Sequence, residues 1–255
     1  MPADSDDKAT IFAIATIAAC IAATAPEAAG HGTACLLLHG RITQLTSVYF
    51  RCSARSTWIA AAGPIGNLAA FALAWLALKG APMQWPRTRL LLFLTMTINI
   101  FWFAGYLIYS ALLNDGDMYF VANDLFGEPT IPLRAAGIAI GAACYWLGLM
   151  AMRPFTSRVL QEARQTRRLL WHSWLAASLS ACVAGLAYAP DRLGATWQAA
   201  LEIGAACLPM LSRTAIARPQ GDAEAGPIQR GNFWISASLL VFALFVATLG
   251  RGMPQ

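Results

Sequence analysis

Long uncharged apolar segments recur along this chain and constrain its fold more than any other feature. Of the 255 residues, 58% are hydrophobic and 12% are charged, against roughly 25% charged in an average soluble domain. A helix that crosses a bilayer needs about 20 predominantly apolar residues. The pattern gives seven candidate spans, at 10–39, 56–78, 90–113, 133–152, 169–189, 196–212 and 233–250. The sequence predicts an all-α polytopic transmembrane bundle of six to seven spans, because the sixth candidate contains Glu202.

The stretch "RITQLTSVYFRCS" at 41–53 differs from its apolar surroundings. It contains Thr, Val, Tyr and Phe, which favour extended backbone. We therefore expect a short hairpin or a re-entrant strand between the first two spans. In the fourth span, Gly137 and Gly141 form a G-x-x-x-G pair, which is typical of helices that pack closely against a neighbour.

Basic residues are distributed unevenly between the two sides that seven spans would create. One side, with the N-terminus and the loops near 79–89, 153–168 and 213–232, holds 12 Lys and Arg residues, and the other side holds 6. Short cytoplasmic loops are enriched in Lys and Arg, so the richer side is predicted to be cytoplasmic. This bias explains the net charge of +5, and nothing in it indicates nucleic-acid binding. Membrane lipid is the expected environment.

The six cysteines show no C-x-x-C spacing, and five of them fall within predicted spans: Cys20, Cys35, Cys144, Cys182 and Cys207. A buried free cysteine behaves as a small apolar side chain. Cys52, in a loop, has no obvious partner outside the membrane. The pattern therefore argues against a disulfide framework.

Three polar features are predicted to meet at the non-cytoplasmic end of the bundle. Glu27 and His31 lie in "TAPEAAGHGTACLLLHG" at 24–40, near the exit of the first span. The segment "AAAGPIGNLAA" at 60–70 begins the second span, and "NDGD" at 114–117 ends the third. Three antiparallel helices bring these ends to one depth. Ionisable groups inside a span are functional candidates by default.

Zinc binding is the chemistry that these residues could share. Zinc accepts imidazole nitrogen and carboxylate oxygen, and a catalytic site combines three protein ligands with one water. Glu27 and His31 are four residues apart, so they share one face of an α-helix. In H-E-x-x-H helices the histidines bind the metal and the glutamate is the general base.

These motifs resemble those of the site-2-protease-like (M50-type) membrane metallopeptidases, in particular a bacterial branch with an H-E-x-x-x-H-G motif. "PEAAGHG" at 26–32 matches this motif at Glu27, His31 and Gly32. "AAGPIGNLAA" is similar to the G-P-x-x-N segment, and "SALLNDGDMYF" to the G-D-W stretch, with Met in place of Trp. The matched residues there are Gly63, Pro64, Asn67, Gly116 and Asp117.

The resemblance covers about residues 10–125 and implies a metallopeptidase-like three-helix core at 1–125, followed by accessory transmembrane helices at 126–255. It implies that His31 and Asp117 ligate zinc and that Glu27 activates water. Asn67, with Gly63 and Pro64, would bind the substrate. The chain departs from the motif at its first histidine, which is Pro26 here. Either His39 or another group replaces this ligand, or the metal is lost.

The resemblance thus implies a zinc hydrolase, or a degenerate relative, that acts on transmembrane protein substrates in a bacterial inner membrane. The alternative is a non-catalytic membrane protein that keeps the helical scaffold and binds a partner helix or lipid.

Each candidate residue also has a purely structural interpretation. Thr24 and Glu27 fit a capping box, with Pro26 in the first turn of a new helix. We therefore expect the first span to kink or restart between 22 and 27, with the Thr24 hydroxyl near the Glu27 amide. Pro64 and Asn67 would then provide only a kink and an interhelical hydrogen bond, and Asp117 would be a turn residue.

Overall fold

The computed structural model describes residues 6–159, 163–216 and 227–253. Within these ranges, six helical segments are long and apolar enough to cross a membrane: Lys8–Leu37, Thr57–Gly80, Pro86–Leu113, Ile131–Thr156, Gln165–Leu186 and Asn232–Gly250. Strands are limited there to one short hairpin. The all-α polytopic bundle predicted from the sequence is confirmed.

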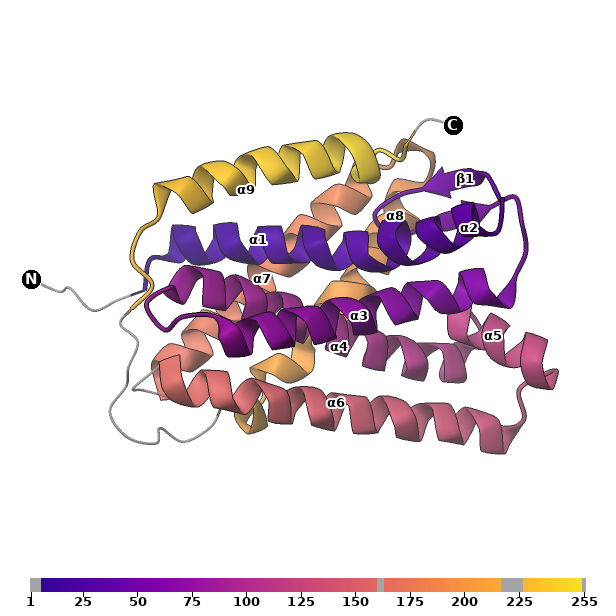
Figure 1. Cartoon of the computed structure of the whole chain (residues 1–255), viewed down its shortest axis with the longest axis horizontal. Helices are drawn as coiled ribbons and strands as arrows, with labels where there is room; N and C mark the ends of the chain where they lie inside the picture. The colour runs from indigo at the N-terminus through magenta and orange to yellow at the C-terminus, as the bar shows by residue number, and fades with distance from the viewer. Residues whose placement is uncertain (1–5, 160–162, 217–226, 254–255) are drawn as a thin grey trace, which may run out of the picture.

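The first span is one continuous helical segment in three parts, namely α1 (Lys8–Thr24), a π-helical segment (Ala25–Gly32) and α2 (Thr33–Leu37). The other long helices are α3 (Thr57–Gly80), α4 (Pro86–Leu113), α6 (Ile131–Val159), α7 (Ala163–Leu186) and α9 (Asn232–Phe245), which ends in a π-helical turn (Val246–Gly250). A short helix, α5 (Asp117–Phe126), follows α4. Figure 1 shows α5 and the hairpin at one end of the bundle and the start of α1 at the other.

Helices α1 and α4 form the centre of the bundle. Helix α4 packs against α1, α3 and α6, and α1 also packs against α7 and α9. Most of the largest fully buried side chains come from these two helices, among them Ile11, Ile14, Leu90, Phe93, Leu94, Met96, Ile98 and Phe101. On α6, a Cβ at Gly141 would lie 2.8 Å from the Ala104 carbonyl oxygen. The predicted packing role of the G-x-x-x-G pair is therefore confirmed at Gly141, where only glycine lets α6 approach α4 this closely.

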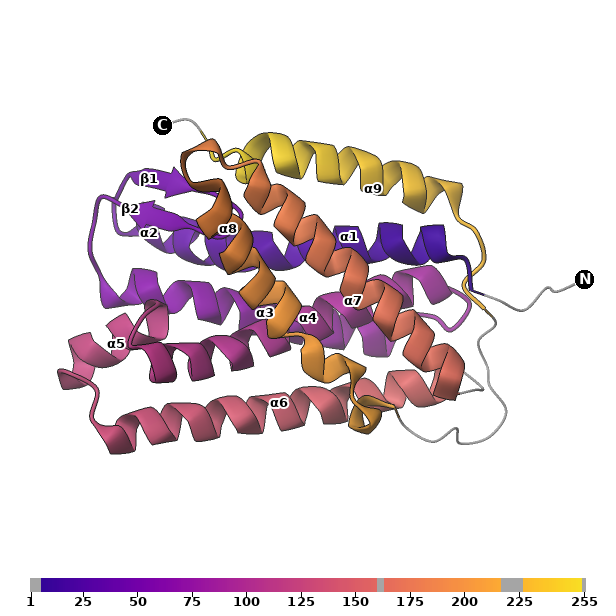
Figure 2. The same ribbon diagram turned by 180° about the vertical axis from the view of Figure 1, so that it is seen from behind.

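The sixth predicted span, 196–212, is not a single helix. It consists of α8 (Arg192–Ala199), a π-helical turn (Ala200–Ala205) and two short 3₁₀ turns (Leu208–Leu211 and Arg213–Ala215). Pro209 contributes to the interruption because it has no N–H to continue the helix. This broken segment still runs from the hairpin end back across the bundle, so the start of α1 and the end of α9 lie at opposite ends (Figure 2).

The predicted hairpin is present as β1 (Ile42–Leu45) and β2 (Phe50–Cys52), which pair antiparallel with an irregularity between Ile42 and Gln44. Its Tyr49 hydroxyl donates to Asp191 at 3.1 Å. The pKa of Tyr49 is raised to about 12, mainly because the hydroxyl is partly buried and secondly because it donates to this carboxylate. Tyr49 therefore remains protonated and keeps donating across the physiological pH range, which attaches the hairpin to the start of α8.

The expectation that no disulfide forms was wrong. Cys35 at the end of the first span and Cys52 in β2 are bonded, with their Cα atoms 6.0 Å apart and a sequence separation of 17. The hairpin reverses the chain over the helix end, and this reversal returns Cys52 to Cys35. The apolar pattern placed Cys35 within the first span and Cys52 in the following loop, and this pattern contains no signal for the reversal. The other four cysteines are free.

Candidate active site

The π-helical segment Ala25–Gly32 carries the first two candidate residues, Glu27 and His31. The helix neither stops nor restarts at Pro26; its hydrogen bonding changes there from the α to the π pattern. The Thr24 hydroxyl donates to the Cys20 carbonyl at 2.7 Å, and Thr24 makes no side-chain capping bond. The predicted capping box and restart were therefore wrong, although a departure from α geometry at this proline was expected. A π-helical turn accommodates the missing N–H without ending the helix.

The π geometry changes which residues share a face. In an ideal α-helix, residues five apart are separated by about 140° around the axis. A π-helix bonds residue i to i+5, so residues five apart lie nearly above one another. Positions 26 and 31 therefore occupy the same strip of this helix. A motif whose two histidine positions are five residues apart fits a π-helix, as a spacing of four residues fits an α-helix.

His31 is held from both ring nitrogens. Its Nδ1 lies 2.6 Å from the Ile59 carbonyl oxygen, and its Nε2 lies 3.1 Å from Asp117 Oδ2. A carbonyl oxygen only accepts, so Nδ1 carries a proton. In the neutral ring, Nε2 would then present a lone pair to a carboxylate oxygen. A cation between these two acceptors, either a proton on Nε2 or a metal ion, makes the arrangement favourable.

Asp117 reaches His31 through an unusual turn. Asn114 ends α4 in the left-handed conformation with φ 54°, and Gly116 follows with φ 84°. A Cβ at Gly116 would be 2.7 Å from the Tyr106 hydroxyl, so this position requires glycine. The Asp117 amide donates to the same hydroxyl at 3.1 Å. The turn therefore fixes Asp117 at the first position of α5, facing the first span.

Helix α3 approaches the π-helical segment through small residues. A Cβ at Gly63 would overlap the His31 ring, and one at Gly66 would overlap the Ala25 carbonyl. Gly63 thus lies against His31, which is a packing requirement in itself. Pro64 and Asn67, further along α3, line a cavity, and the Asn67 side-chain oxygen is buried without a partner in the described residues.

The cavity has a volume of about 1300 Å³ and lies at the hairpin end of the bundle. It is lined by five of the candidate site residues, Glu27, His31, Pro64, Asn67 and Asp117, and also by Pro26. Glu27 is 6% exposed, and its Oε2 has no partner among the described residues. His39 is exposed with φ 57° and does not line the cavity, so it does not replace the ligand missing at Pro26.

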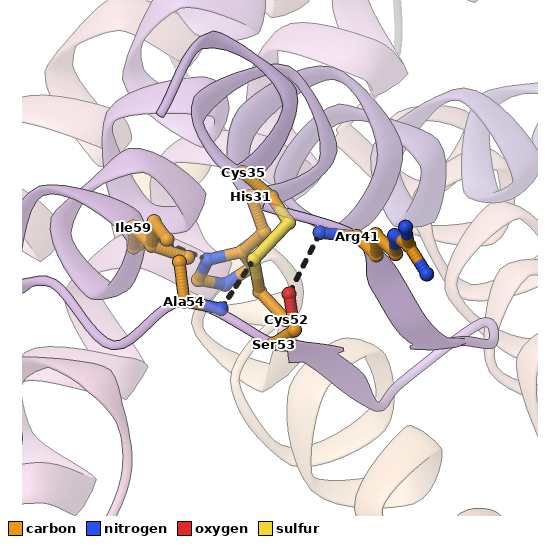
Figure 3. Close-up of a disulfide and its surroundings, with 7 residues drawn as sticks. All are labelled: His31, Cys35, Arg41, Cys52, Ser53, Ala54 and Ile59. Atoms are coloured by element: carbon orange, nitrogen blue, oxygen red, sulfur yellow. Dashed lines mark hydrogen bonds between the residues drawn. A yellow bond between two sulfur atoms is a disulfide. The ribbon is translucent and has the colours of Figure 1, made fainter. Parts of the chain in front are cut away.

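The hairpin forms a cover over His31 that the sequence did not indicate. The Phe50 ring stacks on the imidazole with 5.2 Å between centroids and an interplanar angle of 15°. Two residues later, Cys52 bonds to Cys35, which is one turn beyond His31 on the helix. Figure 3 shows the disulfide beside the His31 ring. The disulfide thus connects the cover directly to the helix that carries the candidate ligand.

The residues fit a zinc ion at two positions and not at a third. Two ligand atoms each about 2.0 Å from a tetrahedral zinc are about 3.3 Å apart, close to the 3.1 Å between His31 Nε2 and Asp117 Oδ2. A ligating histidine also characteristically donates its other N–H to a carbonyl or carboxylate, as Nδ1 does here. The described ranges contain no group of three or more His, Cys, Asp and Glu residues within reach of one ion, and Pro26 has no donor atom.

No family model, curated protein or solved structure matches this chain.

Proposed function

We propose that this chain is a membrane-embedded, metallopeptidase-like protein with a reduced zinc site, and that it acts on a membrane-protein segment in the cavity. His31 Nε2 and Asp117 Oδ2 would hold the ion, with water in the remaining positions. The 3.1 Å approach of these two acceptors, with Nδ1 oriented by the Ile59 carbonyl, carries the proposal. When bound, zinc would polarise a carbonyl and make a bound water more acidic.

The remaining roles belong to the chain's own side chains. Glu27 would accept the proton of the attacking water, since its buried Oε2 is free of hydrogen bonds within the described residues. Asn67 would orient a substrate backbone through its side-chain amide. The Phe50 ring covers His31, so the hairpin would limit access of bulk water to the site.

The proposal is tested by the metal content of the purified protein. We expect about one zinc per chain in the wild type, lost in His31→Ala and in Asp117→Ala. The matched controls are His172→Ala, at a half-buried position, and Glu128→Ala, at an exposed position, both outside the cavity. Both should retain the metal. Glu27→Gln should retain zinc and lose cleavage of a membrane-protein substrate, because an amide cannot act as a base.

A non-catalytic scaffold is the second candidate, and Pro26 at the third ligand position favours it. In that case the wild type contains no zinc even when purified without chelator. Glu27→Gln would then change only the thermal stability. The two candidates therefore give opposite results in the same metal measurement.

We further propose that the site opens on the side away from the cytoplasm. The Cys35–Cys52 disulfide lies at this end of the bundle, and structural disulfides persist in oxidising compartments. By the sequence count, the N-terminus and the loops assigned to the opposite side contain 12 of the 18 Lys and Arg residues. We expect alkaline phosphatase fused after residue 255 to be active and green fluorescent protein fused there to be dark. A bright C-terminal fluorescent fusion would reverse the orientation.

A further inference from the structure

Glu202 is a buried acid outside the candidate zinc ligands, and it lies in the π-helical turn Ala200–Ala205 of the broken segment. It is 6% exposed. Its Oε1 accepts a hydrogen bond from Gln198 Nε2 at 2.8 Å, and its Oε2 has no partner among the described residues. Burying an ionisable group with one oxygen lacking a hydrogen-bond partner in a membrane bundle costs free energy. A ligand that pairs with Oε2 would reduce this cost.

The pocket beside Glu202 has the composition of a site for an organic cation. Its volume is about 450 Å³, and it lies between α4, α6 and the broken segment. Four aromatic side chains line it: Trp102, Tyr106, Tyr109 and Tyr145. Glu202 is the one charged residue among those that line it, and the other described residues there are Gln198 and small or aliphatic ones.

The tyrosine hydroxyls in this pocket already have partners. Tyr145 donates to the Ala206 carbonyl at 3.0 Å, and Tyr109 donates to Asp115 at 3.2 Å. The Tyr106 hydroxyl accepts from the Asp117 amide. What these residues offer a ligand is therefore aromatic ring surface, which attracts ammonium groups through its negative face.

We propose that this pocket binds an organic ammonium ion with an apolar tail. The Glu202 carboxylate pairs with the ammonium group, the aromatic rings surround it, and the tail lies along aliphatic residues such as Ile108, Leu112 and Leu113. A metal ion fits less well, because among the described lining residues one carboxylate and one amide are the only non-aromatic polar side chains. The ammonium group can come from a soluble amine or from the headgroup of an aminophospholipid.

The probe is hexyltrimethylammonium, titrated by calorimetry into the full-length protein in an uncharged maltoside detergent. We expect saturable binding that Glu202→Gln weakens by about tenfold or more, because the amide keeps the approximate shape and lacks the charge. Glu128→Gln, at an exposed position outside the pocket, should bind like the wild type. The uncharged analogue 2,2-dimethyloctane, in which a carbon replaces the nitrogen, should not distinguish wild type from Glu202→Gln.

A second variant protects the test against misfolding of the first. Tyr109→Leu, at a half-buried wall position, should weaken binding severalfold through the lost ring. Equal affinity of wild type, Glu202→Gln and Tyr109→Leu, or no binding to wild type, would overturn the proposal. Competition by phosphatidylethanolamine but not by phosphatidylglycerol identifies a lipid headgroup as the source, and its absence identifies a soluble amine.

This inference does not depend on zinc. The pocket adjoins the larger cavity, and the residues that line both are Trp102, Tyr106, Tyr109, Gln198 and Glu202. His31→Ala should still bind hexyltrimethylammonium like the wild type, because His31 does not line this pocket. Failure of the zinc proposal would therefore leave the ammonium proposal intact, and the reverse is also true.

Discussion

Replacing Pro26 by histidine is expected to tighten zinc binding by at least about tenfold, equivalent to ~1.4 kcal/mol. The substitution adds an imidazole at the position where the chain lacks a donor. Pro26 lies in the π-helical segment, five residues before His31. Residues with this spacing lie nearly above one another in a π-helix, so the new ring would approach the ion held by His31 and Asp117. The measurement is competition for zinc against a chelating dye.

Pro26→Ala is the matched control for this variant. It also removes the proline ring and restores the N–H, but it supplies no ligand. If the π-helical turn depends on the proline, both variants will lose the turn and neither will gain zinc affinity. Zinc affinities that are equal in Pro26→Ala and Pro26→His would contradict the stacking of positions 26 and 31 around one ion.

Removing the Cys35–Cys52 disulfide is expected to destabilise the hairpin end and expose His31. The bond joins residues with a sequence separation of 17, and cross-links that close loops of about this size contribute about 3 kcal/mol. The hairpin carries Phe50, which stacks on His31. In Cys35→Ser/Cys52→Ser we therefore expect a lower melting temperature and faster modification of His31 by diethyl pyrocarbonate.

The control for this pair is Cys144→Ser, since Cys144 is free and half-buried. Cys144→Ser should have the melting temperature of the wild type. A reductant should lower the melting temperature of the wild type and of Cys144→Ser but should not change that of Cys35→Ser/Cys52→Ser. If the wild type and Cys35→Ser/Cys52→Ser melt together with and without reductant, the disulfide does not stabilise the hairpin. Unchanged His31 reactivity would show that the cover stays in place without it.

The sequence predicted the features that depend on local composition. Apolar runs of sufficient length specify membrane helices, because buried backbone in lipid must be hydrogen-bonded within its own segment. The β-branched and aromatic stretch at 41–53 predicted the hairpin. The antiparallel order of three spans also predicted that Asp117 would approach His31, and their side chains lie 3.1 Å apart.

Other features depend on contacts between distant segments or on a choice between similar backbone geometries. Pro26 indicated a departure from α geometry, but a restart and a π-helical turn both accommodate a missing N–H, and the packing of α3 against Gly30 accompanies the second. The disulfide depends on the chain reversal that brings Cys52 back to Cys35.

The surroundings of Glu202 were likewise decided by the tertiary structure. Its sequence neighbours show only an acid in a weak span, whereas its pocket is lined by aromatic residues from α4 and α6. Local sequence thus determined which segments lie in the membrane, because transfer of each segment into lipid depends mainly on its own residues. Which polar groups share a cavity was decided by helix packing, because it depends on side chains far apart in the chain.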